Sequence, residues 1–297
     1  MKQSLVLHCA WLLSFFAAAG AYAQQSLDVP FVGTPPAVMD VMLSMAKVGP
    51  DDFVVDLGCG DGRLVIAAAK KLGARGYGVD LDGALINEAQ RAAEREGVQD
   101  RTRFEARNLY VTDFSKATVL TLYLFPRVNL DLRPRFFREL KPGTRVVSHE
   151  FDFGNWRPDA QTTVEVPDKP YGPPRSTVYL WIIPADASGR WAWRVPELGA
   201  ATYEIALDQT FQQVSTSASA GQSSYTVEET RLSGDLLSFT LLAAGQRQHY
   251  TGRINGDTIS GTVSAGNATA PWTANRIARG KMNIEAARAL PQQASAQ

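Results

Sequence analysis

The chain has 297 residues, of which 45% are hydrophobic, so it is long enough and apolar enough to form two domains with buried cores. Its formal net charge is zero and no long basic run occurs. This balance disfavours nucleic acid as the main partner, because binding phosphates requires clustered Lys and Arg.

The first 23 residues look like a targeting segment. Lys2 precedes a mostly apolar stretch over residues 5–19, and the small-x-small pattern of Ala21 and Ala23 is typical of a cleavage site. The sequence therefore predicts a signal peptide over residues 1–23 and an exported, periplasmic protein. The alternative is an uncleaved segment that anchors the chain to the membrane. After cleavage Cys59 is the only cysteine, so no internal disulfide is expected.

A helix follows the lead-in at residues 30–35, with Thr34 as its expected N-cap. Val38 and Met42 share one face at helical spacing, and residues 49–50 (Gly-Pro) end the element. Two functions fit this segment. One is structural, with the helix packed on an edge of a sheet; the other is a lid, with the loop before the helix closing on a bound ligand.

The most informative stretch is a strand, a glycine turn and a helix over residues 53–72. The turn holds Gly58, Gly60 and Gly62, which permit backbone angles and close approaches that side chains block. Such a turn presents backbone N–H groups to a ligand at the helix N-terminus. Asp56 precedes the glycines, and it would repel a pyrophosphate but suits the ammonium group of a methionine moiety.

A second strand over residues 77–79 ends at Asp80, 18 residues after Gly62. An acid in this position accepts hydrogen bonds from ribose hydroxyls. The pattern G-x-G-x-G after an acid differs from the dinucleotide-binding G-x-G-x-x-G and has no phosphate-loop lysine. It resembles motif I of the class I S-adenosylmethionine-dependent methyltransferases. That resemblance implies a Rossmann-like α/β fold with S-adenosyl-L-methionine as the cofactor.

Further elements complete a seven-stranded sheet with helices on both faces. A helix follows Leu81, and strands are predicted at residues 103–106, 119–124 and 145–149, with an antiparallel pair at 162–166 and 177–183. A helix is expected over residues 131–140. The methyltransferase layout places residues 108–110 beside adenine, where the Asn108 amide can donate and accept hydrogen bonds. Asn is also common in turns for local reasons.

The resemblance narrows when several motifs are taken in chain order. They are residues 30–35 (PFVGTP), 55–63 (VDLGCGDGR), 125–126 (FP), 145–148 (RVVS), and the FDF and WRP runs at 151–153 and 156–158. Together these resemble the lysine N-methyltransferases of the ATP synthase c subunit and the adenine nucleotide translocase, and their prokaryotic relatives, over residues 28–160. The implied reaction is methylation of a protein lysine, including one on a membrane protein. A small-molecule amine is the alternative acceptor.

The resemblance and the ends of the strands together define the expected site. The expected cofactor-binding residues are Thr34, Asp56, Gly58, Cys59, Gly60, Gly62, Asp80, Asn108 and Leu109; the expected acceptor-side residues are Tyr123, Phe125, Pro126, Glu150 and Trp156. Aromatic walls would lower the free energy needed to deprotonate a lysine, and Glu150 would orient the amine, accept a proton or only cap its strand. No metal-ligand spacing occurs.

A second domain is predicted over residues 190–279, after a methyltransferase domain at 24–185 and a linker-like run. Residues 231–238 (RLSGDLLS) recur as 253–260 (RINGDTIS), and each copy is a strand, a Gly-Asp turn and a strand. The sequence predicts a small antiparallel meander, either an open barrel or a sandwich, closed by residues 272–276. Its partner is not apparent, and residues 280–297 are expected to form a flexible tail.

Two function classes remain at this point. The first is an active methyltransferase. The second is an exported binding protein that keeps the fold without turnover and recognises its partner through the β domain. Export also poses a supply problem, since S-adenosylmethionine is made in the cytoplasm.

Overall fold

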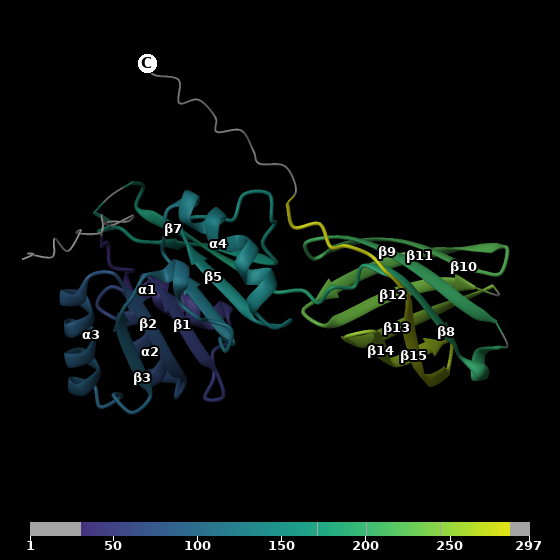
Figure 1. Cartoon of the computed structure of the whole chain (residues 1–297), viewed down its shortest axis with the longest axis horizontal. Coiled ribbons are helices and arrows are strands. Elements are labelled where there is room, and N and C mark those ends of the chain that lie inside the picture. The colour runs from purple at the N-terminus through teal and green to yellow at the C-terminus, as the bar shows by residue number, and fades with distance from the viewer. Residues whose placement is uncertain (1–30, 171, 200, 244, 286–297) are drawn as a thin grey trace, which may run out of the picture.

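The computed structural model describes residues 31–170, 172–199, 201–243 and 245–285. These residues form an α/β domain and a β-barrel, which lie side by side in Figure 1. The predicted signal peptide at residues 1–23 and most of the predicted tail lie outside the described residues. In the described part of the chain, no helix combines the length and apolar character needed to cross a bilayer.

The α/β domain is built on the seven-stranded sheet that the sequence predicts. Its strands are β1 (Phe53–Leu57), β2 (Arg75–Asp80), β3 (Thr102–Ala106), β4 (Val119–Leu122), β5 (Arg145–His149), β6 (Ala160–Glu165) and β7 (Arg175–Ile182). Their spatial order is β3-β2-β1-β4-β5-β7-β6. Strands β1 to β5 are parallel, and β7 runs antiparallel to β5 and β6. Because the order reverses between β1 and β4, ligands are expected outside the carboxyl ends of these two strands.

Helices cover both faces of the sheet. They are α1 (Pro36–Met45), α2 (Arg63–Leu72), α3 (Gly83–Arg95) and α4 (Pro126–Glu139). Buried side chains of α1 and α2 share one core with Val54 and Val147 of the sheet, and α2 and α3 share a second. Helix α4 packs with Val55 and Val146 in the core of the opposite face.

Two helix starts differ from the sequence-based expectation. Helix α1 begins at Pro36 with Pro35 as its N-cap, so Thr34 is not the cap. Helix α4 begins at Pro126 rather than near residue 131, and Phe125 is its N-cap. Proline is favourable at a first helical position because its missing N–H has no partner there in any case.

Strand β2 shows why the helices can lie so close to the sheet. A Cβ atom on Gly76 would lie 2.5 Å from Cγ1 of Val65, and one on Gly78 would lie 2.8 Å from Sγ of Cys59. The two glycines therefore let α2 and the motif I turn pack directly against β2.

The second domain is a closed antiparallel barrel. Its strands are β8 (Gly189–Arg194), β9 (Thr202–Thr210), β10 (Gln213–Ala220), β11 (Ser223–Ser233), β12 (Leu236–Ala243), β13 (Gln246–Asn255), β14 (Thr258–Ala265) and β15 (Ala268–Arg279). The two sequence repeats form the hairpins β11–β12 and β13–β14, as predicted. Closure corrects the expectation of an open barrel or sandwich, because β15 pairs with β8 and β8 with β9.

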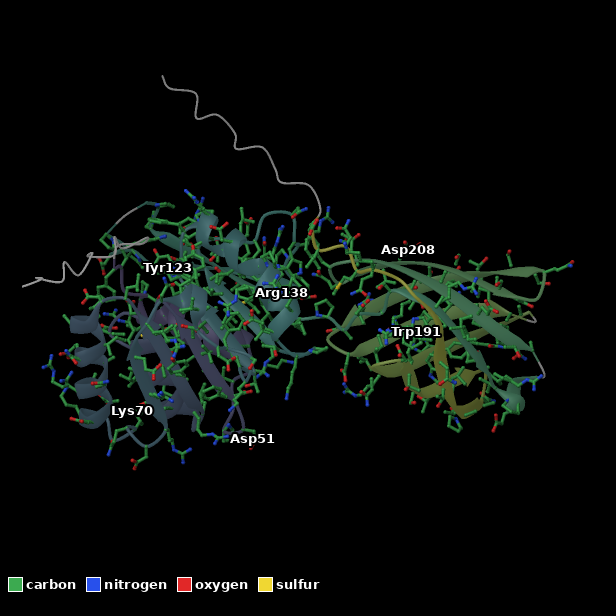
Figure 2. The ribbon with its side chains drawn as sticks, viewed as in Figure 1. Asp51, Lys70, Tyr123, Arg138, Trp191 and Asp208 are labelled. Carbon is green, nitrogen blue, oxygen red and sulfur yellow. The ribbon has the colours of Figure 1, made fainter. Side chains whose placement is uncertain are left out.

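Aromatic rings fill the interior of the barrel. The Trp193, Phe239, Tyr250 and Trp272 side chains are at most 3% exposed, and their ring centroids lie 5.0–5.9 Å apart. Figure 2 labels Trp191 in this domain and Tyr123 in the α/β domain. The hydroxyl of Tyr250 donates to Oε1 of Gln248 at 2.7 Å, so its polar end is satisfied within the core.

The turn between β9 and β10 packs against the α/β domain. Phe211 has φ +53° and is 3% exposed, with its ring 6.0 Å from that of Trp156 and 5.7 Å from that of Phe137. Next to it, Oε1 of Gln212 accepts from Nε1 of Trp156 at 2.9 Å, and its Nε2 donates to the carbonyl of Arg157. The barrel is thus packed into the aromatic core beside α4.

Candidate active site

The glycine turn after β1 forms the floor of the site. Gly58, Gly60 and Gly62 have φ of +78°, +54° and +74°, which a side chain rarely tolerates. The N–H groups of Gly58 and Cys59 donate to the carbonyl of Val79 at 2.9 Å, which fixes the turn against β2. A Cβ on Gly58 would lie 2.8 Å from Cδ2 of Leu124, so the turn brings bare backbone to the wall of the cavity.

Asp80 stands at the carboxyl end of β2, as predicted from its spacing. Its Oδ2 accepts from the N–H of Gly60 at 2.9 Å, and its Oδ1 accepts from the N–H of Asp82 at 3.0 Å. Each oxygen keeps a second lone pair, and Asp80 lines the cavity. The carboxylate is therefore held rigidly and retains the capacity to accept two hydroxyl hydrogen bonds.

Asp56 is a buried carboxylate that is 7% exposed. Its Oδ1 accepts from the hydroxyl of Thr121 at 2.8 Å. The pKa of Asp56 is raised to about 7, mainly by burial; the hydrogen bond from Thr121 opposes this rise, and the nearby charges of Asp80 and Asp61 contribute to it. No cation of the described residues pairs with Asp56, so a positively charged ligand group would stabilise its ionised form.

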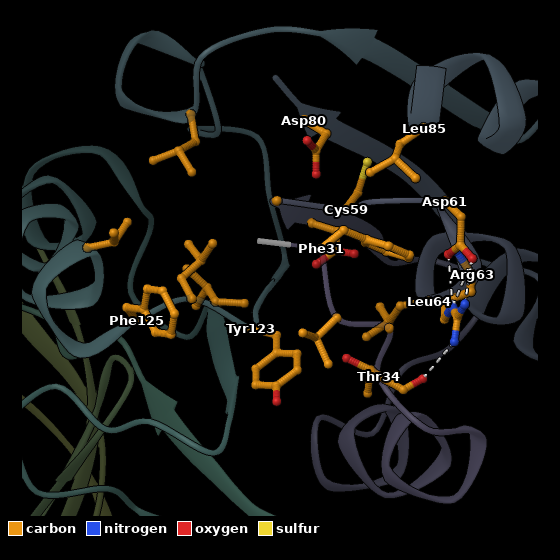
Figure 3. Close-up of a pocket in the computed structure, with 18 of the residues that line it drawn as sticks. Phe31, Thr34, Cys59, Asp61, Arg63, Leu64, Asp80, Leu85, Tyr123 and Phe125 are labelled. Atoms are coloured by element: carbon orange, nitrogen blue, oxygen red, sulfur yellow. Dashed lines mark hydrogen bonds and ion pairs between the residues drawn. The ribbon is translucent and has the colours of Figure 1, made fainter. Parts of the chain in front are cut away.

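The segment before α1 is tied to the glycine turn through Arg63. The guanidinium makes a two-pronged ion pair with Asp61, with Nε and Nη2 at 2.8 and 2.6 Å from the carboxylate. It also donates to the carbonyl of Thr34 at 3.4 Å (Figure 3). A Cβ on Gly60 would lie 2.2 Å from Cε2 of Phe31, so this ring covers the turn. Both functions considered for the segment thus have structural support, since the helix packs on the sheet and its lead-in covers the site.

These parts enclose a cavity of about 560 Å³ at the carboxyl ends of β1, β2 and β4. In Figure 3, Asp80 and Cys59 lie on one side of Phe31, and Tyr123 lies on the other with Phe125 beyond it. We call the first region the cofactor end and the second the acceptor end. Cofactor-end lining residues are Asp56, Gly58, Cys59, Asp80, Asp82, Asn108 and Leu109; acceptor-end lining residues are Tyr123, Phe125, Glu150, Phe151 and Lys169.

The acceptor end is largely aromatic. The Tyr123 ring lies 6.4 Å from that of Phe151 in a stacked arrangement, and the Phe125 ring meets Phe151 edge-on at 6.1 Å. Burial raises the pKa of Tyr123, and the charge of Glu150 adds to the effect. The hydroxyl of Tyr123 therefore stays protonated at neutral pH.

His149 supports this wall from behind. Its ring lies 3.9 Å from that of Tyr123, its Nε2 lies 2.9 Å from Oγ of Ser176, and its Nδ1 lies 3.4 Å from Oγ1 of Thr34. Burial lowers the pKa of His149 to about 4, so the ring is neutral at physiological pH. His149 is fully buried and is not one of the lining residues, which favours a structural role over that of a base.

Most of the predicted site residues come together in this cavity. The predicted residues that line it are Thr34, Asp56, Gly58, Cys59, Asp80, Asn108, Leu109, Tyr123, Phe125 and Glu150. Gly60 and Gly62 contribute the shape of the turn. The Asn108 Oδ1 accepts from the N–H of Tyr110 at 2.8 Å, so this oxygen has the local role that was considered beside adenine recognition.

Two acceptor-side predictions are corrected by the structure. Trp156 is fully buried in the core beneath α4, where it contacts Phe211 and Gln212, and it does not line the cavity. Pro126 begins α4 and is also absent from the cavity wall. Both residues follow strand ends, which favours the acceptor side, but the chain turns away from the cavity at each of them.

Sequence reasoning missed several side chains that line the cavity, among them Arg63, Arg107 and Lys169. The basic residue directly after the last motif glycine is a signal for Arg63, because its pairing with Asp61 is local. Lys169 comes from the loop between β6 and β7, and no spacing in the sequence connects it to the site.

The residues of the cofactor end fit S-adenosylmethionine. Asp56 would hold its ammonium group, Asp80 its ribose hydroxyls, and the bare backbone of the glycine turn leaves room for the amino acid portion. The cofactor supplies an electrophilic methyl group on a sulfonium. The sheet order, the turn and the paired acids together define a class I S-adenosylmethionine-dependent methyltransferase.

Comparison with known proteins narrows the class. Residues 56–160 match the ANTKMT methyltransferase domain. A protein-lysine N-methyltransferase of Saccharolobus islandicus is 45% identical over 156 residues, which cover 52% of this chain and 94% of that relative. The human lysine N-methyltransferase of the ATP synthase c subunit is 32% identical over 51% of this chain and 65% of its own length. A solved RNA methyltransferase from Salinibacter ruber, in complex with S-adenosyl-L-homocysteine, is 47% identical over 51% of this chain and 93% of its own, with a TM-score of 0.46.

The chain therefore belongs to the protein-lysine N-methyltransferase family that includes the enzymes named for the adenine nucleotide translocase and for the ATP synthase c subunit. The family match at residues 56–160 lies in the α/β domain, and these matches to relatives cover 48–52% of this chain. This result favours the active methyltransferase over a binding protein without turnover.

Proposed function

We propose that this enzyme transfers the methyl group of S-adenosylmethionine to the ε-amine of a lysine in a protein substrate. The observation that carries the proposal is the acceptor end, where Tyr123, Phe125 and Phe151 form an aromatic wall beside Glu150. The names of the relatives support lysine as the acceptor. A small-molecule amine is the alternative acceptor.

The aromatic wall addresses the main energetic obstacle of the reaction. A lysine amine with a pKa of about 10.4 costs roughly 4–5 kcal/mol to deprotonate at pH 7. Apolar rings that exclude water disfavour the charged amine and so lower this cost. The rings also restrict the direction of approach, and in a displacement reaction alignment contributes much of the rate acceleration.

Charge also favours a cationic acceptor over a nucleic acid. Five carboxylates line the cavity, namely Asp56, Asp61, Asp80, Asp82 and Glu150, against the three cations Arg63, Arg107 and Lys169. Asp61 is neutralised by Arg63 and Glu150 by Lys169. The remaining carboxylates, Asp56, Asp80 and Asp82, lie at the cofactor end and outnumber Arg107, so the cavity as a whole repels phosphates.

The test is a transfer assay with radiolabelled S-adenosylmethionine and a panel of acceptors. The panel holds the ATP synthase c subunit in detergent, a soluble lysine-rich protein, an RNA and a free amine. We expect label on protein, located by mass spectrometry on lysine Nε, and much less label with the Asp80→Ala variant at a cofactor concentration near the Kd of the unmodified chain. Label confined to RNA or to the free amine would contradict the proposal.

We also propose that residues 1–23 direct export of the chain. The proposal rests on the apolar segment and the small-x-small pattern at Ala21 and Ala23. A fusion of the N-terminal segment to alkaline phosphatase tests it, since that reporter is active only outside the cytoplasm. An inactive fusion that retains Met1 would contradict export.

A further inference from the structure

The loop between β6 and β7 inserts a lysine into the acceptor end of the cavity. The side chain of Lys169 is 8% exposed. Its Nζ donates to Oε2 of Glu150 at 3.0 Å and to the carbonyl of Arg175 at 2.8 Å. Lys169 lines the cavity together with Tyr123 and Phe125. An ammonium of this chain thus occupies the region where the proposed function requires the ammonium of a substrate.

Glu150 is held at this position by its backbone. It follows β5 with φ +71°, a conformation that non-glycine residues rarely adopt, and its N–H donates to the carbonyl of Thr177 at 2.7 Å. Such backbone strain persists where the surrounding structure fixes it, and it is frequent at functional sites. The side chain of Glu150 is 23% exposed, and its carboxylate forms an ion pair with Lys169.

We propose that Glu150 is the carboxylate that receives the ammonium of the acceptor lysine, and that Lys169 occupies this carboxylate until the acceptor displaces it. The proposal rests on the proposed lysine specificity and names two residues that determine it. Lys169 marks the acceptor position by its chemistry, because it presents the same functional group on the same flexible stem as the substrate side chain.

The contacts of Lys169 allow the exchange. Glu150 and one backbone carbonyl are the polar partners of its Nζ within the described residues, and both can be replaced by water when the side chain leaves. The residue lies in a loop, with its N–H bonded to the carbonyl of Val166, so its side chain can move without disturbing a sheet ladder. An arriving lysine would restore the charge balance at Glu150 that the departure of Lys169 removes.

The exchange reduces the apparent affinity for an acceptor. When the competent state is only a fraction of the population, the apparent dissociation constant is the intrinsic one divided by that fraction. If Lys169 occupies Glu150 for about nine-tenths of the time, removing it strengthens acceptor binding by about tenfold.

The experiment is a calorimetric titration of the full chain, saturated with S-adenosylhomocysteine, with N-acetyl-lysine amide as the acceptor probe. Lys169→Met removes the competing charge and should lower the Kd of the probe by about tenfold. Lys169→Arg keeps the charge and should resemble the unmodified chain. Lys71→Met removes a lysine that is paired with Asp40 on the surface and should leave the Kd unchanged.

The Glu150→Gln variant tests whether the competition depends on the Glu150 carboxylate. It should weaken binding of the probe, and in this background Lys169→Met should have no effect, because the competition requires the Glu150 carboxylate. An unchanged or higher Kd for Lys169→Met, in a sample that binds S-adenosylhomocysteine normally, would overturn the proposal. So would an equal gain for Lys169→Met with and without the Glu150 carboxylate.

The same variants separate this inference from the proposed function. Tighter probe binding by Lys169→Met, together with no methyl transfer to any protein lysine, would leave the ammonium site intact and contradict the lysine methyltransferase proposal. Methyl transfer to protein lysine with no effect of Lys169→Met on probe binding would support the function and overturn the role of Lys169.

Discussion

The α/β domain leaves an open cavity at its strand ends, whereas the barrel fills its centre with rings. The cavity measures about 560 Å³ and is lined by acids whose charges exceed those of the nearby bases. In the barrel, the rings of Trp193, Phe239, Tyr250 and Trp272 pack against one another in the core. Aromatic side chains therefore line a ligand cavity in the α/β domain and fill the core of the barrel.

The largest expected change is in stability, from a substitution in the core of the barrel. Trp272→Ala removes a 3% exposed side chain from the ring cluster and should lower the free energy of unfolding of the barrel by about 3–5 kcal/mol. Hydrogen exchange measures this separately for barrel and sheet amides. Binding of S-adenosylmethionine should stay within twofold of the unmodified value. A loss of cofactor binding from a barrel that remains folded would contradict the division of roles.

Asp56→Asn should raise the free energy of unfolding at neutral and alkaline pH, because the ionised Asp56 carboxylate destabilises the folded chain. The pKa of Asp56 is raised from 3.8 to about 7, so between these pH values the folded chain binds more protons than the unfolded chain. The free energy of unfolding therefore falls as pH rises through this window, by up to about 4 kcal/mol at about 1.4 kcal/mol per pH unit.

The Asn side chain stays neutral, so the variant should match the unmodified protein near pH 4 and be more stable at pH 8. Urea unfolding at the two pH values measures the difference. The variant should also lose affinity for the cofactor, because its ammonium loses the charged partner. A less stable variant at pH 8 would contradict the account of Asp56.

Asp80→Ala tests the cofactor end directly. The loss of a charge-assisted hydrogen bond costs about 1.5–3 kcal/mol, so affinity for S-adenosylmethionine should fall by about 10- to 150-fold. Asp235→Ala is a matched control, because Asp235 lies in the barrel, where it pairs with Arg253 of β13. Calorimetry on both variants makes the comparison, and equal losses would show that the effect is not local to the cavity.

The smallest expected change in stability comes from the contact between the two domains at Gln212 and Trp156. Gln212→Ala leaves Nε1 of Trp156 without its partner and should destabilise the protein by about 1–2 kcal/mol. Urea unfolding followed by tryptophan fluorescence measures this loss. Gln213→Ala, an exposed position on β10, is the control. An unchanged unfolding midpoint for Gln212→Ala would show that the two domains are not coupled through this bond.

Local sequence patterns were enough to predict much of the fold and of the cofactor end. The glycine turn, Asp56 and Asp80 are close in sequence, and their spacing alone predicts the turn that the structure shows. The two barrel hairpins are likewise visible as a repeat with Gly-Asp turns. Each of these features depends on interactions between neighbouring segments, and such interactions leave regular spacing in a sequence.

The remaining features depend on contacts between distant segments. Trp156 suits the acceptor side by its place in the sequence, but the Phe211 turn of the barrel, 55 residues later, buries it. The sequence-based prediction contains no strand at β8, although the alternation of Trp191, Trp193 and Val195 is a strand signal. Lys169 reaches Glu150 through the path of an irregular loop, and no periodic pattern encodes that path.

One titration tests the central claim that a single cavity of the α/β domain binds the cofactor. Calorimetry of the full chain with S-adenosylmethionine should show one site for each chain. The expected Kd is micromolar, which corresponds to a binding free energy of roughly −8 kcal/mol. The Asp80→Ala variant should weaken binding at this site by about 10- to 150-fold, and Trp272→Ala should keep it within twofold. A well-folded sample that binds no cofactor, or that binds it unchanged after Asp80→Ala, would contradict the claim.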